Sequence, residues 1–287
     1  MAQGPGTNTV ITGGNAGIGL ATAVGVARTG ANVILAVRSP IKGAEAVAHV
    51  RHAVPGASID VMPLDLASLA SIRSFADALG ERLDSLDVLV NNAGLTLKKR
   101  TLTADGFETT FGVNHLGHFL LTNLLHDRLA AAESPRVVVV ASDAHRFARR
   151  GMPFDDLHSE RKYGAMRVYG ASKLANMLFT HEAARRWKPD GITVNCLHPG
   201  FVATRIGRDG DGGRLGEVAA TLLRPLAKSP ERGASTSVFL ATAAEPASVT
   251  GKYFVNSKTK QPAATALDDA AALRLWQVSS DLVGIAG

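Results

Sequence analysis

The amino-acid sequence predicts an α/β fold in which one doubly wound, mainly parallel sheet carries helices on both faces. Short β-prone runs alternate with longer helical patterns along the chain, and about seven such strands can be counted, as expected of consecutive βαβ units. The run 137–141 is apolar at every position, which is typical of a central parallel strand. A glycine-rich turn directly follows the first strand and opens the first helix, which also fits this fold class.

The predicted elements are bounded by ordinary start and stop signals. Ser39 and Pro40 provide a cap and a first-turn proline at a helix start, whereas Pro55-Gly56 and Gly191 end helical patterns. The strands are expected at 8–12, 32–37, 59–64, 88–90, 137–141, 193–197 and 252–255. The helices are expected at 20–29, 40–54, 73–83, 105–129, 165–187, 218–226, 230–244 and 266–282.

Composition and charge narrow the class of protein. The chain has 287 residues, of which 46% are hydrophobic and 20% charged, and this suits a single globular domain over residues 1–287. No run of about 18 apolar residues is present, no secretory pattern opens the chain, and Cys196 has no cysteine to pair with, so we expect a cytoplasmic protein without an integral membrane segment. The net charge of +6 suits a phosphate-bearing ligand, while basic clusters without interleaved aromatic residues argue against nucleic acid.

The glycine-rich turn at 13–19 is the first candidate binding element, with the spacing T-G-x-x-x-G-x-G. Glycines let a backbone approach a phosphate closely, and a helix N-terminus supplies free N–H groups and a positive dipole. In this strand–turn–helix setting, dinucleotide binding is favoured over a glycine loop of no special role. The candidate binding residues are Gly13, Asn15, Gly17, Ile18 and Gly19.

Arg38 follows the second predicted strand, where the adenosine ribose of a dinucleotide is usually recognised. An NAD-binding unit commonly places an acidic residue there, and that acid would repel a 2′-phosphate. A guanidinium would instead grip the phosphate with paired N–H donors. We therefore expect NADP(H) rather than NAD(H), the alternative being a surface arginine at a strand end.

Two further strand ends carry residues suited to a nucleotide. Asp65, which precedes Leu66, could accept a hydrogen bond from an adenine amino group or could equally cap the following helix. The small residues Asn92, Ala93 and Gly94 would leave room for a flat ring at the carboxyl end of a central strand, with a structural turn as the alternative.

Tyr169 and Lys173 are four residues apart in the helical pattern 165–187 and should share one face of the helix. A phenol has a pKa of about 10, and a neighbouring ammonium lowers that pKa by stabilising the phenolate. Such a phenol can exchange a proton with a substrate oxygen. The alternative is a structural tyrosine beside a solvated lysine, which this pair alone would not exclude.

Two polar residues could complete a catalytic set with this pair. Ser142 ends the run 137–141, where α/β sheets bind their ligands, and no G-x-S-x-G elbow supports a hydrolase. Asn114 is a helical amide that could hold an ordered water or be a satisfied core amide. His115 and His118 lack a nearby cysteine or carboxylate cluster, so we expect no metal site.

Taken together, these residues resemble the short-chain dehydrogenase/reductase family, whose members have a single-domain doubly wound Rossmann fold. The stretches 114–119, 172–176 and 197–200 are similar to its retinol dehydrogenase-like branch, with protochlorophyllide reductases as cousins, and 251–254 and 275–276 extend the likeness. Two departures stand out: membrane-bound relatives have an N-terminal anchor, whereas we expect none in this chain, and no cysteine lies near Tyr169 as the photoreductase interpretation would require. The elements shared with the family, in its order, are Thr12-Gly13, Gly17-Ile18-Gly19, Asp65, Asn91-Asn92-Ala93-Gly94, Asn114, Ser142, Tyr169, Lys173 and Pro199-Gly200.

The resemblance implies an enzyme that transfers a hydride between NADP(H) and a carbonyl or a primary or secondary alcohol. It implies that Ser142 binds the substrate oxygen and that Tyr169 supplies the proton. Lys173 would lower the pKa of the tyrosine and hold the nicotinamide ribose, and Asn114 would position a water. Pro199, Gly200 and Val202 are the remaining cofactor contacts that it implies.

The segment 201–228 would cover the substrate pocket, and its apolar side chains suit a lipophilic substrate. Those side chains include Val202, Ile206, Leu215, Val218, Leu222 and Leu223. The resemblance also makes a homodimer or homotetramer plausible. The rival hypothesis is a non-catalytic NADP(H)-binding redox sensor or interaction module on the same scaffold, because a fold does not fix a function.

Overall fold

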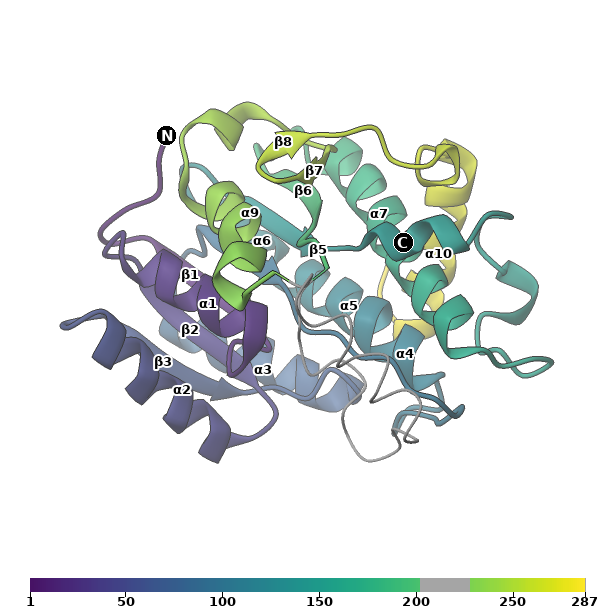
Figure 1. Cartoon of the computed structure of the whole chain (residues 1–287), viewed down its shortest axis with the longest axis horizontal. Coiled ribbons are helices and arrows are strands. Elements are labelled where there is room, and N and C mark those ends of the chain that lie inside the picture. The colour runs from purple at the N-terminus through teal and green to yellow at the C-terminus, as the bar shows by residue number, and fades with distance from the viewer. Residues whose placement is uncertain (202–227, 287) are drawn as a thin grey trace.

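An eight-stranded sheet crosses the molecule in the order β3-β2-β1-β4-β5-β6-β7-β8 among the described residues (Figure 1). The structure is a computed structural model that describes residues 1–201 and 228–286. Strands β1 to β7 are parallel, whereas β8 pairs antiparallel with β7. The strands are β1 (Asn8–Thr12), β2 (Asn32–Val37), β3 (Ile59–Pro63), β4 (Val88–Asn91), β5 (Arg136–Val140), β6 (Thr193–His198), β7 (Tyr253–Val255) and β8 (Lys258–Thr259).

The strand order reverses direction at β1, which lies between β2 and β4. Val10 of β1 is in register with Ile34 on one side and with Leu89 on the other. In open α/β sheets, ligands bind beyond the carboxyl ends of the strands at such a switch point. The topology therefore places the turn after β1 and the loop after β4 at the position of a ligand site.

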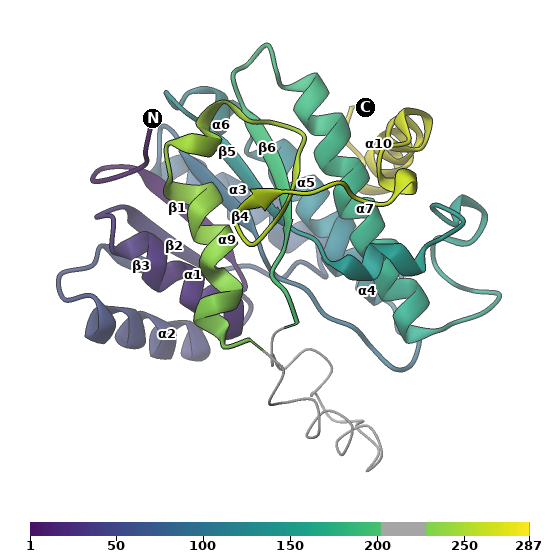
Figure 2. The same cartoon turned by 45° about the horizontal axis from the view of Figure 1, so that its top comes forward.

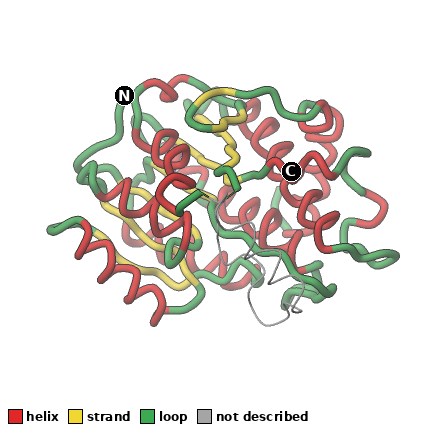
Figure 3. Tube along the Cα trace, viewed as in Figure 1, coloured by secondary structure: helices red, strands yellow, loops and turns green. Residues whose placement is uncertain are grey.

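Helices cover both faces of the sheet, as Figure 3 shows. Neighbouring residues of β1 point to opposite faces, so Val10 belongs to one apolar core and Ile11 to the other. The Ile11 core packs under α1 (Gly17–Ala27), α2 (Pro40–Ala53) and α9 (Pro230–Thr242), and α9 lies beside α1 in Figures 1 and 2. The Val10 core packs under α3 (Leu69–Arg82), α5 (Gly117–Leu124), α6 (His126–Ala130), α7 (Ala165–Arg186) and α10 (Asp269–Val283).

An aromatic cluster joins three helices on the face of the sheet that holds the Val10 core. Phe119 of α5, Phe179 of α7 and Trp276 of α10 have ring centroids 5.0 to 5.9 Å apart. Trp187 lies 5.7 Å from Trp276, and the Arg186 guanidinium lies 4.5 Å from the Trp276 ring. These contacts hold α10 against α7, and each is worth about 1 kcal/mol beyond the burial of its area.

The predicted helix 105–129 is wrong in its limits and its continuity. Gly106 has a φ of +83° and residues 104–107 form a turn, while Glu108 caps the following helix by accepting from the N–H groups of Thr110 and Phe111. The helical stretch then runs through α4 (Thr109–Phe111), a π-helical turn η1 (Gly112–Leu116), α5 and α6. The two-residue strand β8 was also not expected, because such a short edge pairing leaves no periodic pattern.

Two other expectations meet the limits of the described chain. The helix predicted at 218–226 and most of the covering segment 201–228 fall on residues 202–227, outside the described residues. Within the described part, no helix combines the length and the apolar character needed to span a bilayer.

Candidate active site

The first βα turn leaves the N-terminus of α1 open. Gly13 and Gly17 have φ values of +63° and +54°, left-handed backbone that favours glycine. A Cβ on Gly19 would lie 2.4 Å from the Gly13 carbonyl oxygen, so this tight turn requires glycine there as well. Among the described residues, no side chain caps α1 and its first turn contains no acid. The free N–H groups and the positive dipole fit the phosphates of a dinucleotide, as the sequence predicts.

Thr12 ties the loop after β4 to this turn. Its Oγ1 accepts hydrogen bonds from the backbone N–H of Asn92 at 2.9 Å and of Ala93 at 3.0 Å. The Asn92 amide donates in return to the Thr12 carbonyl oxygen at 2.8 Å. Gly94 borders Lys173, because a Cβ on this glycine would lie 3.4 Å from the lysine Nζ. The predicted cofactor residues of two separate loops are therefore brought together.

His118, for which no role was expected from the sequence, connects this loop with Asn114. Its Nδ1 donates to the Asn114 carbonyl oxygen at 3.2 Å, which leaves its Nε2 to accept from the Thr12 hydroxyl at 2.9 Å. Burial lowers the pKa of His118 to about 4 and that of His115 to about 3, so both rings are neutral. A histidine four residues after Asn114, together with a threonine before the glycine turn, is the only sequence signal of this link.

Neither histidine lies in a metal-binding cluster. Across residues 1–201 and 228–286, no group of three or more His, Cys, Asp or Glu side chains is placed to hold a metal ion. His115 instead shares a hydrogen bond of 2.8 Å with the Ser279 hydroxyl of α10. Its ring therefore serves helix packing.

Asn114 lies in the π-helical turn η1 and is fully buried. Its Oδ1 accepts from the Leu95 N–H at 2.8 Å, and its Nδ2 donates to the Leu95 carbonyl oxygen at 2.9 Å and to Ser172 Oγ at 3.0 Å. Both amide hydrogens are thus taken by protein atoms, as in a satisfied core amide. Ser172 in turn donates to the Tyr169 carbonyl oxygen at 2.8 Å, so Asn114 supports the tyrosine through Ser172.

Ser142, Tyr169 and Lys173 meet beyond the carboxyl end of β5. Ser142 follows the strand closely and lies near enough to the Tyr169 phenol to lower the pKa of that group. The Lys173 Nζ lies 5.7 Å from the centroid of the Tyr169 ring and donates to the Val140 carbonyl oxygen at 2.8 Å. The predicted shared face of α7 is thus confirmed, and the serine lies within reach of the phenol.

Gly170 explains how α7 comes so close to the serine. The 3₁₀ turn η2 (Asp143–Phe147) follows Ser142 and packs against α7. A Cβ on Gly170 would lie 2.8 Å from the Ala144 carbonyl oxygen and 3.2 Å from the Phe147 Cβ. The residue after Tyr169 must therefore be small for the phenol to reach Ser142.

The pKa of Tyr169 is raised, which corrects the expectation that Lys173 lowers it. Burial disfavours the phenolate, and the hydrogen bond with Ser142 offsets this only in part. Burial also lowers the pKa of Lys173 to about 8. The lysine Nζ is bound to the Val140 carbonyl rather than to the phenol oxygen, so its charge does not dominate the phenol in this structure.

The remaining predicted cofactor residues lie along the same edge of the sheet. Arg38 follows β2 directly and is exposed. Asp65 follows β3, and its Oδ1 accepts from the Ala67 N–H at 3.0 Å, while Ser68 rather than Asp65 caps α3. Leu66 is buried. Asp65 therefore shapes the turn before α3 and does not form the helix cap.

The chain leaves β6 through Pro199 and Gly200, and Gly200 has a φ of +90° that favours glycine. This turn follows the strand next to β5, so it lies on the same edge as Ser142. Val202 lies outside the described residues.

Comparison with known proteins decides the family. A family model described as enoyl-(acyl carrier protein) reductase matches residues 13–257. Human retinol dehydrogenase 13 is 46% identical over 98% of this chain and 86% of its own length. The chain belongs to the short-chain dehydrogenase/reductase family. It is similar to the retinol dehydrogenase-like branch of that family, since human retinol dehydrogenase 14 is also 41% identical over 98% of this chain and 87% of that protein.

Members of the short-chain dehydrogenase/reductase family are oxidoreductases that use a nicotinamide cofactor. A protein of uncharacterised function from Mycobacterium paratuberculosis is 32% identical and aligns over 99% of this chain and 98% of its own, with a TM-score of 0.75. The Pseudomonas aeruginosa RhlG/NADP active-site complex is 27% identical and aligns over 87% of this chain and 94% of its own, with a TM-score of 0.69. The fold of these relatives is therefore the fold found here.

Proposed function

We propose that this chain is an NADP(H)-dependent oxidoreductase that interconverts a carbonyl and an alcohol of a lipophilic substrate. The observation that carries the proposal is the meeting of Ser142, Tyr169 and Lys173 at the sheet edge that also holds the open N-terminus of α1. Reduction of a carbonyl needs a hydride source and a proton donor, and this edge offers a place for each. The names of the retinol dehydrogenase relatives support an alcohol or aldehyde substrate, with retinoids as one candidate.

The cofactor would lie across the switch point of the sheet. The turn after β1 would bind the pyrophosphate, and the exposed Arg38 would bind the 2′-phosphate that distinguishes NADP(H). The solved structures of two relatives, from Pseudomonas aeruginosa and Beutenbergia cavernae, contain NADP, and this supports the choice. The residues proposed to contact the cofactor are Gly13, Asn15, Gly17, Ile18, Gly19, Arg38, Asp65, Leu66, Asn92, Ala93, Gly94, Tyr169, Lys173, Pro199, Gly200 and Val202.

The bound cofactor would supply or accept the hydride at the substrate carbon. In the reductive direction the substrate oxygen gains negative charge, and the hydroxyls of Ser142 and Tyr169 stabilise that charge by hydrogen bonding. Tyr169 gives its phenolic proton to this oxygen, and the Lys173 ammonium stabilises the resulting phenolate. Because burial raises the pKa of Tyr169, the phenol stays protonated until the substrate oxygen draws the proton away.

Asn114 would help to position Tyr169. Its amide donates to the Ser172 hydroxyl, which in turn donates to the Tyr169 carbonyl oxygen. We further propose that residues 1–287 act as one domain, that the segment 201–228 covers the substrate, and that the chain assembles as a homodimer or homotetramer. Size-exclusion chromatography with light scattering would test the assembly.

Tyr169→Phe tests the catalytic assignment directly. We expect turnover to fall by about 1,000-fold or more, because the proton donor is lost, while the Kd for NADPH stays within about threefold. Stopped-flow turnover and fluorescence titration of NADPH measure the two quantities. A variant with full activity would refute the role of Tyr169.

The rival hypothesis is a non-catalytic NADP(H)-binding module. A panel of ketones and aldehydes that includes all-trans-retinal, assayed for NADPH consumption, separates it from the enzyme. Consumption that depends on both substrate and Tyr169 supports the oxidoreductase. Tight NADPH binding without consumption of any panel member supports the module.

A further inference from the structure

The peptide group between Ser142 and Asp143 is held at both ends by histidine rings. The Ser142 carbonyl oxygen accepts from His145 Nδ1 at 2.7 Å and from the His145 backbone N–H at 3.1 Å. The Asp143 N–H donates to His198 Nδ1 at 3.3 Å. A carbonyl oxygen can only accept and a backbone N–H can only donate, so the two rings use their Nδ1 atoms in opposite senses.

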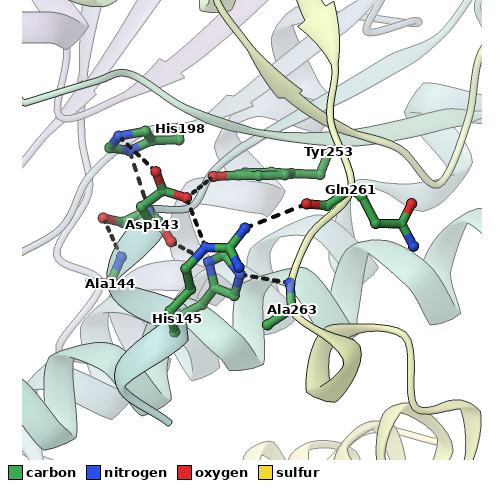
Figure 4. A network of polar contacts seen from close by, with 9 residues as sticks. Asp143, Ala144, His145, His198, Tyr253, Gln261 and Ala263 are labelled. Carbon is green, nitrogen blue, oxygen red and sulfur yellow. Dashed lines mark hydrogen bonds and ion pairs between the residues drawn. The ribbon is translucent and has the colours of Figure 1, made fainter. Parts of the chain in front are cut away.

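The tautomer of His145 is fixed by a second backbone group. Its Nδ1 must carry the proton, and its Nε2 accepts from the Ala263 N–H at 3.1 Å (Figure 4). The ring is fully buried, with its centroid 5.6 Å from that of Tyr253 in an edge-to-face arrangement. Both ring nitrogens are satisfied only by the neutral ring protonated at Nδ1.

His198 takes the other tautomer. Its Nδ1 is an acceptor, so its proton is on Nε2, which lies 3.7 Å from Asp143 Oδ2. The other carboxylate oxygen, Oδ1, accepts from the Tyr253 hydroxyl at 2.9 Å. Figure 4 shows Asp143 between His198 and Tyr253, so the loop from β5 is joined to both β6 and β7.

The orientation of this peptide determines what the Ser142 hydroxyl can do. Ser142 has an extended backbone with φ −167° and ψ 153°, and its Oγ accepts from the Ala144 N–H at 3.1 Å. Because Oγ accepts there, its hydrogen is available to be donated elsewhere. Rotation of the Ser142–Asp143 peptide would change ψ and carry Ala144 with it, so the geometry of this acceptor bond depends on the two histidines.

We propose that His145 and His198 are positioning residues that clamp the Ser142–Asp143 peptide in their neutral, opposite tautomers and thereby aim the Ser142 hydroxyl at the substrate oxygen. The contact between Ser142 and a substrate oxygen rests on the proposed function. The hydrogen bonds of the two histidines to the Ser142–Asp143 peptide do not. In this role each ring acts through the serine and not through contact with substrate or cofactor. A shift of about 1 Å in a reacting group can cost about 100-fold in rate, so loss of this clamp should lower kcat.

Acid should open the clamp. Protonation of His145 at Nε2 would point one N–H at the Ala263 N–H, so that hydrogen bond would be lost. Protonation of His198 at Nδ1 would break its hydrogen bond with the Asp143 N–H in the same way. Burial lowers the pKa of both rings, which favours the neutral forms near neutral pH. Two sets of charged and titratable groups face these rings. Those near His145 are Asp143, Arg146, Tyr253 and Lys260, and those near His198 are Asp143, His145, Lys228 and Lys260.

A pair of substitutions at His145 separates its two hydrogen bonds. In His145→Asn the amide N–H takes the place of Nδ1 and still donates to Ser142, whereas in His145→Gln the amide reaches the place of Nε2 and only the Ala263 side is served. We expect kcat to fall by about 10- to 100-fold in the Gln variant and by less than about threefold in the Asn variant, with KM and the NADPH Kd nearly unchanged in both. The same pair of substitutions at His181, a partly exposed residue on α7 that contacts Asp269, serves as the control and should change none of these three constants. Equal losses in the Asn and Gln variants, or losses confined to KM, would overturn the proposal.

A measurement on the wild-type protein keeps the clamp testable without any substrate. Ring ¹⁵N NMR spectra near about pH 7.5 should show His145 protonated at Nδ1 and His198 protonated at Nε2. Exchanged tautomers, or a charged ring at this pH, would refute the clamp even if turnover were normal. Failure of every substrate would instead remove the proposed function and leave the tautomers as the test of the clamp.

Discussion

At the scale of single residues, Lys173 is a buried cation whose folding cost should depend on pH. Its pKa falls from 10.5 to about 8 because burial disfavours the charged form. Between those two values the unfolded chain binds more protons than the folded chain, so stability from this group rises with pH across the window. Below about pH 8 the full penalty applies, since both states are then charged.

We therefore expect the free energy of unfolding of the wild type to rise by about 2 kcal/mol more than that of Lys173→Met between about pH 7.5 and about pH 9.5. Urea unfolding at both pH values measures this double difference, and the Met variant removes the contributions of all other titrating groups. Parallel pH dependence in the two proteins would show that Lys173 is not charged and buried as described.

Arg38 carries the choice between the two nicotinamide cofactors. Arg38→Asp should raise the KM for NADPH by about 10- to 100-fold, because charge-assisted hydrogen bonds to the 2′-phosphate are replaced by repulsion. The KM for NADH should change by less than about threefold, since NADH has no such phosphate. Steady-state kinetics with both cofactors checks this, and an equal change in both KM values would contradict the NADP(H) proposal.

Several site residues could be predicted from their position in the sequence, because strand ends and helix periodicity alone bring them together. Tyr169 and Lys173 share a face for this reason, and Ser142 follows the apolar strand that leads to them. The raised pKa of Tyr169 could not be predicted, since it depends on burial by residues distant in the chain. The hydrogen bond between His118 and Thr12 spans 106 positions, so no local pattern reveals it.

At the scale of elements, the approach of α7 to η2 determines the distance between Tyr169 and Ser142. Gly170→Ala should therefore lower kcat by about 10-fold or more, because the new methyl would meet the Ala144 carbonyl oxygen at 2.8 Å and push the helix away. Alanine would otherwise stabilise a helix by up to about 1 kcal/mol relative to glycine. Turnover and thermal melting together check the result.

Gly164→Ala is the control at the N-cap of the same helix, since its added Cβ would meet only the Arg167 Cβ at 3.8 Å, an ordinary contact. It should leave kcat within about twofold. If Gly170→Ala melted higher and turned over normally, close approach of the two elements would not be required.

The limits of the parallel strands agree with the sequence to within one residue, because each is an apolar run closed by a turn signal. The helix expected at 105–129 failed where Gly106 and Glu108 turn the chain before Thr109, and where a π-helical turn surrounds Asn114. Apolar periodicity continues through such turns, so it could not mark them. The helix at 218–226 stays a prediction.

At the scale of the whole molecule, Arg136 joins the amino end of the sheet to the end of α9 and to the start of the chain. Its guanidinium is buried and donates to the carbonyl oxygens of Leu240 at 3.1 Å and Ala243 at 2.6 Å, and also to that of Met1. These acceptors include the last carbonyls of a helix, whose negative dipole end suits a cation.

Arg136→Met should lower the free energy of unfolding by about 2 kcal/mol, since buried carbonyl groups would lose their donors. Urea denaturation measures this free energy. Arg28→Met is the control, because Arg28 directly follows α1 and its side chain is exposed. The control should change stability by less than about 0.5 kcal/mol. Equal stability of both variants would show that water replaces the arginine without cost.

The aromatic cluster beneath α10 also determines which part of this protein its tryptophan fluorescence reports on. Trp187 and Trp276 are the two tryptophans of the chain, and their rings touch within that one cluster. Trp187 follows Tyr169 by 18 positions along α7, which corresponds to about 27 Å of helix. Tryptophan emission therefore comes from a single place and will report whether the C-terminal helix is packed, while events at the opposite end of α7 will reach it only through long-range quenching or energy transfer.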